Sequence, residues 1–258
     1  MQTSPHIFST FAAQMKNHKS GFVNIIGKPN AGKSTLLNAL LGEKLSIISH
    51  KPQTTRHRIL GIKTEPGYQI VFSDTPGVLK PGYGLHKAMM ETVEKSLEDA
   101  DVVLWLIDAL ETSDGFDDLP LFTHHKQMPV IIAINKIDKP GANPDKVRES
   151  LSKNNILVEE WGGKYQCQEI SAKTGKGIDD LLEKVLLEAE LLNLKANPDR
   201  QASGSIIEAM LDKGRGYVAT IMVQNGTLKI GDIMLAGSNY GRVKAMYDDT
   251  GKRINEAG

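Results

Sequence analysis

The sequence has little of several features that would assign it to a specialised class of protein. Cysteine occurs once among 258 residues, as Cys167, so an internal disulfide is excluded, and one cysteine with seven scattered histidines gives no zinc-ligand spacing. Aromatic residues make up 5% of the chain, and 31 basic residues balance 31 acidic ones, so net charge attracts neither nucleic acid nor an anionic membrane. These features predict a globular protein of a reducing cytoplasm, and they leave its partner open.

Long hydrophobic runs are also missing. The longest apolar stretch, around residues 102–107, is far shorter than the ~20 residues that a membrane-spanning helix needs, so we expect no membrane partner. The N-terminal segment MQTSPHIFSTFAAQ has neither a charged front nor an unbroken apolar run, which argues against a signal peptide. We interpret residues 1–18 as a disordered extension.

The first three quarters of the chain alternate short β-rich runs with helical patterns. This alternation predicts an α/β fold, in which helices cover both faces of a mostly parallel sheet. The short connection EPG predicts a hairpin between 59–63 and 68–72, so the sheet should be mixed, with one antiparallel edge strand. The other predicted strands are 22–26, 102–107, 130–134 and 165–170, and the predicted helices are 34–41, 86–97 and a segment from Ile178 onward.

The pattern changes after Asn197-Pro198. The segments SIIEAML, GYVATIMV, TLKIGDIML and GRVKAMYD are short, strand-like and separated by glycine turns, which predicts an all-β module of about 60 residues. We therefore expect an α/β domain at 19–197 and a smaller all-β domain at 198–258.

A phosphate-binding motif follows the first predicted strand. The segment GKPNAGKS fits G-x-x-x-x-G-K-[ST] in the strand, loop and helix context that the motif requires. Its glycines let backbone N–H groups surround a phosphate, while Lys33 is placed to reach the β and γ phosphates and Ser34 to bind Mg²⁺. The predicted nucleotide contacts are Gly27, Asn30, Ala31, Gly32, Lys33, Ser34 and Thr35.

Three later motifs specify the nucleotide further. In SDTPG, Asp74 ends an apolar strand where its carboxylate can hold magnesium through water, and Gly77 can donate its backbone N–H to a γ-phosphate. The segments Asn135-Lys136-Ile137-Asp138 and Ser171-Ala172-Lys173 both end predicted strands, so we expect them beside the ligand crevice of the sheet.

Asp138 distinguishes guanine from adenine. Its carboxylate can accept hydrogen bonds from the ring N–H and from the 2-amino group of guanine, and adenine lacks both donors. With four motifs in this order, the sequence predicts a site for GTP or GDP, with Asn135, Lys136, Ser171, Ala172 and Lys173 around the base.

Two different stretches of the chain resemble two different protein families. The segments HKSGFVNIIGKPNAGKSTLLNALLGEKLSIIS, PQTTRHRILGI and FSDTPGV resemble the Era family of bacterial ribosome-assembly GTPases. The resemblance implies that Thr55 closes on magnesium, with Thr54 as the alternative. It also implies that Asn30 helps to hold a potassium ion where an arginine finger would sit; alternatively, Asn30 merely completes a loop turn.

From about Met128 onward the chain is similar to bacterial translation initiation factor 2. The segments that carry this resemblance include AINKIDKPGANPDKV, SAKTGKGIDDLLE and LDKGRGYVATIMVQNGTLKIGDI, and they run from that family's GTPase domain into its β-barrel second domain. We therefore expect a chimeric P-loop GTPase with a seam between about 113 and 128, followed by a truncated all-β barrel. We identify no GXXG-bearing pattern of the Era family's KH domain in this sequence.

These resemblances imply a partner as well as a reaction. We expect weak binding to the small ribosomal subunit or its rRNA, and weak self-association through the open barrel edge. Lys213 and Arg215, on a glycine-rich turn of the barrel, are equally consistent with contacts to rRNA phosphates and with a solvated hairpin tip. We expect Trp105 and Trp161 to pack within the fold rather than to stack on a base.

Two functions remain open. The first is slow, Mg²⁺-dependent and potassium-stimulated GTP hydrolysis, with Lys33, Thr55, Gly77 and Asn30 as catalytic residues and Ser34, Thr55 and Asp74 around the metal. Hydrolysis should be slow because Val78 stands where initiation factor 2 has a histidine, and valine cannot orient water. The alternative is a nucleotide-binding module without turnover, joined to a ribosome-contacting barrel fragment.

Overall fold

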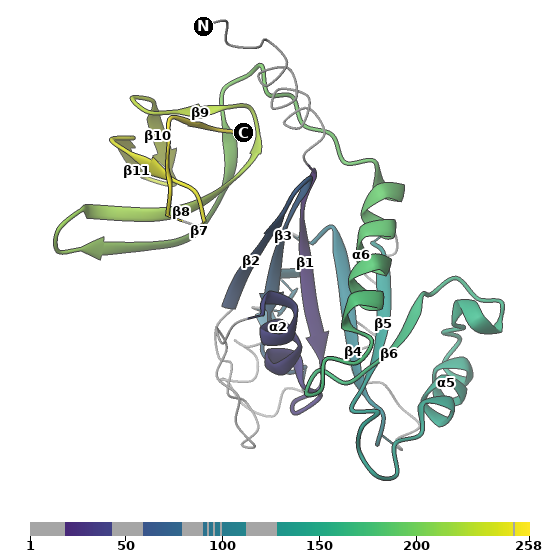
Figure 1. Ribbon diagram of the computed structural model, residues 1–258. Coiled ribbons are helices and arrows are strands. Elements are labelled where there is room, and N and C mark those ends of the chain that lie inside the picture. Colours follow the sequence, from purple (N-terminus) through teal and green to yellow (C-terminus); the bar gives the residue numbers. More distant parts are fainter. Residues whose placement is uncertain are drawn as a thin grey trace, which may run out of the picture. The chain divides into compact units, whose positions relative to one another are not determined.

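The computed structural model describes residues 19–42, 59–78, 90–111 except 92, 95 and 99, and 128–258 except 250. The predicted extension 1–18, Thr54, Thr55 and most of the expected seam lie outside these residues. The chain divides into two units, Met1–Asn193 and Leu194–Gly258, which Figure 1 shows.

A six-stranded sheet forms the centre of the first unit. Its strand order is β2-β3-β1-β4-β5-β6, with β2 antiparallel to β3 and every other pair parallel. The predicted mixed, mostly parallel sheet with an antiparallel edge strand is therefore confirmed. The strands are β1 (Lys19–Gly27), β2 (Ile59–Glu65), β3 (Tyr68–Asp74), β4 (Val102–Asp108), β5 (Val130–Asn135) and β6 (Cys167–Ile170).

The helices begin and end at residues whose local chemistry explains the boundary. Gly42 ends α2 with a φ of 76° and donates its N–H to Asn38 O at 3.0 Å. Asn143 begins α5 by accepting the Lys146 N–H at 2.9 Å, and Pro144 follows at the first helical position. The described helical elements include α2 (Lys33–Leu41), α5 (Pro144–Lys153), the 3₁₀ turn η1 (Glu159–Trp161) and α6 (Ile178–Leu192).

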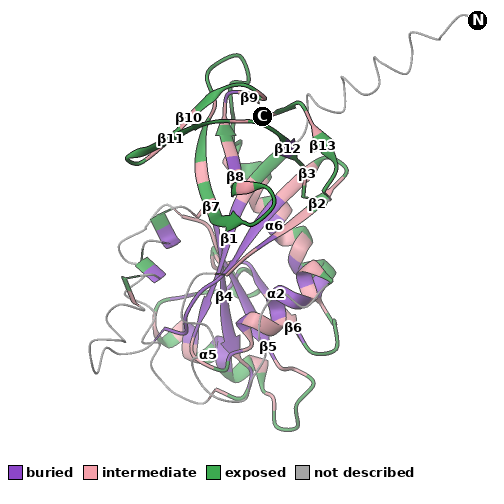
Figure 2. Cartoon of the chain, turned by 90° about the vertical axis from the view of Figure 1, so that its left-hand side faces the viewer, coloured by how far each residue is buried: buried purple, intermediate pink, exposed green. Residues whose placement is uncertain are grey.

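Helices cover both faces of the sheet, as predicted. Alternate side chains of β4 point to opposite faces, so Leu104 and Leu106 pack in one core while Val103, Trp105 and Ile107 pack in the other. The first core lies under α2 and α6, which Figure 1 shows against the sheet, and the second lies under α5 and the helical residues among 90–98. Figure 2 shows the strands of the sheet buried between these two layers.

The second unit consists of short antiparallel pairs. Strands β7 and β8 form a long hairpin, β10 pairs with β11, β12 with β13, and β14 with β9. Of the residues described in this unit, Met222 and Met246 are its buried apolar side chains, and much of it is exposed in Figure 2. The strands are β7 (Ser203–Asp212), β8 (Gly216–Asn225), β9 (Leu228–Lys229), β10 (Ile233–Ala236), β11 (Asn239–Arg242), β12 (Met246–Tyr247), β13 (Arg253–Ile254) and β14 (Glu256–Ala257).

The two tryptophans differ in their environment. Trp105 is 1% exposed inside β4, which confirms that it packs in the core. The expectation of packing is wrong for Trp161, which is 42% exposed because it lies on the surface turn η1 that Gly162 closes with a φ of 81°. Within the described parts of the chain, no helix is long and apolar enough to cross a membrane.

We predict that Trp105→Ala lowers the free energy of unfolding of the first unit by about 3–5 kcal/mol, because it leaves a large cavity in the core beneath α5. Trp161→Ala is the matched control and should change it by no more than about 0.5 kcal/mol. Urea denaturation followed by circular dichroism measures both. Equal midpoints for the two variants would contradict the assignment of Trp105 to the core.

Candidate functional site

The loop between β1 and α2 has a backbone that only small residues allow. Gly27 has a φ of 150°, and a Cβ there would lie 2.3 Å from Leu106 O. Gly32 has a φ of 103°, and its Cβ would lie 2.4 Å from Asn135 Nδ2. Asn30, at the exposed tip, has a φ of 62°, which asparagine tolerates better than most residues. The absence of two Cβ atoms therefore lets the loop pack closely against β4 and the end of β5.

Lys33 is buried at the base of this loop, at the first turn of α2. Its Nζ donates to Gly27 O and to Lys28 O, both at 3.0 Å. The ammonium group therefore lies against the backbone of the loop, next to the N-terminal end of the helix, where the helix dipole also favours a negative charge. This arrangement suits a phosphate group.

Ser34 and Asp74 bring two oxygen groups together beside the loop. Ser34 Oγ donates to Asp74 Oδ2 at 2.6 Å, and the Asp74 side chain is buried at the end of β3. A hydroxyl and a carboxylate are ligands of the kind that Mg²⁺ prefers. The chemistry of this donor pair therefore fits magnesium. Thr55, the third predicted metal residue, lies outside the described residues.

The segment after β3 packs directly on the loop between β1 and α2, which we call the phosphate loop. A Cβ on Gly77 would lie 2.8 Å from Pro29 N, so the two loops can approach this closely only with glycine at that position. The Val78 N–H donates to Gly27 O at 3.1 Å, and the Val78 side chain is buried in the core beneath α5. Neither Gly77 nor Val78 therefore offers a side-chain polar group to a water molecule.

The Asn135 side chain connects three of the predicted motifs. Its Nδ2 donates to Ala31 O at 2.7 Å, and its Oδ1 accepts the Ala172 N–H at 3.0 Å. Because these atoms belong to the phosphate loop, the end of β5 and the end of β6, one buried amide holds the three loops together at one edge of the sheet.

Asp138 is exposed at this edge and is oriented by Ser171. Ser171 Oγ donates to Asp138 Oδ1 at 2.7 Å, and this hydrogen bond is the main reason that the pKa of Asp138 lies below its ordinary value. Lys136, two residues earlier, has a φ of 70°, and Lys173 is exposed at the neighbouring turn. The structure thus brings the residues predicted to surround the base together.

Two acidic residues at this edge were not predicted from the sequence. Lys136 Nζ lies 2.5 Å from Asp108 Oδ2, and Lys28 Nζ lies 2.5 Å from Glu111 Oε1. Asp108 is the last residue of β4, and Glu111 lies three residues after it. The position of Asp108 at the end of an apolar strand was the available signal, but nothing in the sequence pairs either acid with its lysine.

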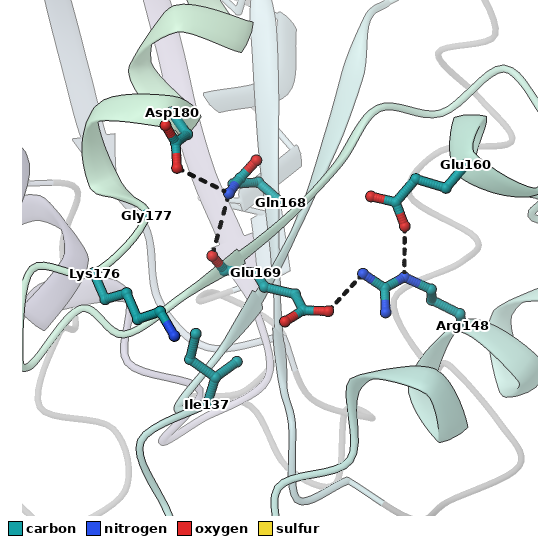
Figure 3. Close-up of a pocket in the computed structure, with 8 residues that line it drawn as sticks. All are labelled: Ile137, Arg148, Glu160, Gln168, Glu169, Lys176, Gly177 and Asp180. Atoms are coloured by element: carbon teal, nitrogen blue, oxygen red, sulfur yellow. Dashed lines mark hydrogen bonds and ion pairs between the residues drawn. The ribbon is translucent and has the colours of Figure 1, made fainter.

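A cavity of about 300 Å³ lies between α5, η1, β6 and the start of α6 (Figure 3). On one wall is Arg148, whose guanidinium lies 2.7 Å from Glu169, 2.9 Å from Asp145 and 3.1 Å from Glu160. Of the motif residues, Ile137 alone lines the cavity, and no residue of the phosphate loop does. The cavity is therefore a feature separate from the predicted nucleotide site.

Comparisons with known proteins agree with this geometry. Residues 22–136 match the family model described as 50S ribosome-binding GTPase, and residues 201–258 match the model described as elongation factor G domain 2. The crystal structure of Era in complex with MgGDPNP and nucleotides 1506–1542 of 16S ribosomal RNA is 32% identical, with a TM-score of 0.58, and the match covers 80% of this chain and 78% of that one. The chain belongs to the P-loop GTPases.

Curated relatives resemble this GTPase over most of its length. Translation initiation factor IF-2 of Cytophaga hutchinsonii is 49% identical over 243 residues, and that of Phocaeicola vulgatus is 47% identical over 249 residues. In both cases the match covers 93% of this chain and 23% of the relative, so the chain spans about a quarter of the length of these proteins. A bacterial selenocysteine-specific elongation factor, with a TM-score of 0.70 and 19% identity, shares the fold over 93% of this chain and 40% of its own.

We predict that Ser171→Ala raises the pKa of Asp138 towards its ordinary value, because the variant removes the hydrogen bond that favours the carboxylate. A depressed pKa keeps Asp138 charged down to lower pH, so in the variant the charge is lost at a higher pH as acid is added. An NMR titration of the aspartate side-chain carbonyl carbons measures the shift. Ser238→Ala, in the exposed turn after β10, is the matched control, and an unchanged Asp138 titration in Ser171→Ala would contradict the assignment.

Proposed function

We propose that this GTPase binds GTP at the edge formed by the β1, β3, β5 and β6 loops and hydrolyses it slowly, with Mg²⁺ and with stimulation by K⁺. The observation that supports this most is the Asn135 amide, which joins the phosphate loop to both predicted base loops. In this proposal the Asp138 carboxylate accepts from guanine while Ser171 holds it in place. The backbone of Gly27, Asn30, Ala31, Gly32 and Thr35 surrounds the phosphates.

Each predicted residue then has a distinct role. Lys33 neutralises charge on the β and γ phosphates, and the Gly77 N–H donates to the γ-phosphate. Ser34, Asp74 and Thr55 hold Mg²⁺, which when bound neutralises charge on the phosphate oxygens. In the reaction, the oxygen of water attacks the γ-phosphorus, the bond to the bridging oxygen breaks, and GDP and phosphate leave.

Turnover should be slow because Val78, the residue directly after the TPG segment, has no side-chain group that can orient the attacking water. Val78 is buried in the apolar core and donates only its backbone N–H, to Gly27 O. Thr55 and Lys33 supply contacts to metal and phosphate but no base. The same observation favours a second candidate function, a module that binds guanine nucleotide without turning it over.

Potassium is proposed to supply part of the missing positive charge through Asn30. Asn30 is exposed at the tip of the phosphate loop, where its side chain is accessible to a cation. Its φ of 62° also fits the simpler role of completing the turn, since asparagine tolerates this conformation. The two roles differ in whether Asn30 affects turnover in one cation only.

The domains, the location and the partners of the protein are proposed from its relatives. We propose that residues 19–197 form the nucleotide domain and that residues 198–258 form a barrel domain. We also propose that the protein acts in the cytoplasm and that it binds the small ribosomal subunit or its rRNA weakly. Weak self-association through the second unit is supported by exposed apolar side chains on one face of β10 and β11, namely Ile233, Leu235 and Tyr240.

A mosaic origin is also proposed, with a seam between about 113 and 128. The first part carries Val78, which fits the Era resemblance, whereas initiation factor 2 has histidine there. The comparisons find both resemblances, to an Era structure at 32% identity and to IF-2 relatives at 45–49% identity.

We predict that Asp138→Asn lowers GDP affinity at least about tenfold and creates affinity for xanthosine diphosphate, because the new amide can donate to the 2-oxo group of xanthine. Titration with fluorescent GDP and xanthosine diphosphate measures both constants. Asp199→Asn, an exposed position outside the site, is the matched control and should bind GDP like the parent. Unchanged GDP affinity in Asp138→Asn would remove Asp138 from the site.

Phosphate release from GTP should require Mg²⁺ and should be faster in K⁺ than in Na⁺. Lys33→Ala should abolish tight nucleotide binding, whereas Asn30→Ala should leave binding largely intact and remove only the potassium increment. A phosphate-release assay in matched K⁺ and Na⁺ buffers measures the rates. Equal rates in the two cations would disprove potassium stimulation, and GDP binding with no release in either would favour the module without turnover.

A further inference from the structure

The turn at the end of β4, residues 108–111, contacts lysines from two different nucleotide motifs. Its first residue, Asp108, pairs with Lys136 of the β5 loop at 2.5 Å, and its last, Glu111, pairs with Lys28 of the phosphate loop at 2.5 Å. The two acids are three residues apart, while their partners are more than 100 residues apart in the sequence. The turn therefore links the phosphate side of the site to the base side.

Backbone hydrogen bonds hold this turn in one conformation. Within the turn, Glu111 N donates to Asp108 O at 2.9 Å and Leu110 N to Asp108 Oδ1 at 3.0 Å. Outside it, Ala109 N donates to Asn135 O at 2.8 Å, and Asn143 N donates to Ala109 O at 2.9 Å. Asn135 ends β5 directly before the loop that carries Lys136 and Asp138, which we call the base loop, and Asn143 caps α5. These hydrogen bonds therefore attach the turn to both ends of the segment that carries the predicted base contacts.

Both ion pairs are more buried than an ordinary surface pair. The four side chains are at most 27% exposed, whereas the Lys19–Glu190 pair on the outer surface is more than 60% exposed at both ends. Exposed pairs are screened by solvent and contribute little, while partly buried pairs are screened less. The two inner pairs can therefore fix the positions of the loops that carry them.

Each lysine is placed where its position affects the site. The backbone carbonyl of Lys28 accepts from Lys33 Nζ at 3.0 Å, so the placement of Lys28 bears on the lysine that faces the phosphates. Lys136 has a φ of 70°, a conformation that costs energy for a residue other than glycine and persists only when its surroundings hold it. The contact with Asp108 is one such restraint, two residues before Asp138.

We propose that Asp108 and Glu111 are positioning residues that fix the phosphate loop and the base loop relative to each other before nucleotide binds. The inference rests on the proposed nucleotide site. Glu111 acts through Lys28 on the phosphate side, so its loss weakens binding of any guanine nucleotide. Asp108 acts through Lys136 on the base side, so its loss also weakens the discrimination between bases.

The phosphate-side pair is tested by exchanging its charges. Glu111→Lys and Lys28→Glu should each weaken GDP binding about tenfold, because each single exchange places like charges side by side. The double variant restores an ion pair of opposite sense and should bind GDP within about threefold of the parent, which a double-mutant cycle expresses as coupling. Fluorescent GDP titration measures the constants, and circular dichroism confirms that each variant is folded.

The base-side pair is tested by nucleotide preference. Inosine diphosphate lacks the 2-amino group of guanine, so the ratio of GDP to inosine diphosphate affinity reports how well Asp138 is placed. Asp108→Asn, which keeps the shape of the side chain, should lower this ratio about threefold. Glu111→Gln should weaken both nucleotides by the same factor and leave the ratio unchanged. Glu190→Gln removes the outer pair and is the control for loss of an ion pair away from the site.

The outcomes separate this inference from the proposed function. A parent protein that binds no GDP overturns the proposed function and, with it, this inference. A parent that binds GDP, together with variants that match it in affinity and preference, overturns the inference alone. It is also overturned if the double exchange fails to recover binding and Asp108→Asn weakens both nucleotides equally, because that pattern reports only a loss of general stability.

Discussion

The buried amide of Asn135 is the contact on which the arrangement of the site depends. It donates to Ala31 O in the phosphate loop and accepts from the Ala172 N–H after β6, so one side chain fixes the distance between these two loops. The amide fits there only because Gly32 has no Cβ, which would otherwise lie 2.4 Å from Asn135 Nδ2. A buried amide with both of its ends satisfied is costly to rearrange, since each lost partner leaves a polar group unpaired.

The sheet places this amide where it can act. Strands β1, β3, β4, β5 and β6 are parallel, so their carboxyl ends meet at one edge, and each of these ends contributes a loop or turn described above. The two apolar cores hold the strands in register, with the inner strands buried on both faces. The polar loops can thus adopt costly backbone conformations, such as that of Lys136, because the packed sheet restrains them.

The two units are stabilised by different kinds of interaction. In the first, large apolar side chains such as Phe72 and Trp105 are fully buried between sheet and helices. The second has few buried apolar side chains, and its turns are held largely by local hydrogen bonds, such as those from Gly214 N and Arg215 N to Asp212 Oδ1. That same contact lowers the pKa of Asp212 and shapes the turn that carries Lys213 and Arg215. Burial of apolar surface contributes more to stability than such local hydrogen bonds. The first unit can therefore hold the side chains of a site in fixed positions more firmly than the second.

The sequence by itself determined the fold class, the antiparallel edge strand and the identity of the nucleotide motifs. These properties depend on local patterns: apolar periodicity, the EPG turn, and glycines and asparagines at positions that need a positive φ. The tertiary structure alone decided which motif residues touch. The pairing of Lys28 with Glu111 and the approach of Gly77 to Pro29 both depend on which strand ends lie side by side, and residue spacing within one segment carries no record of that.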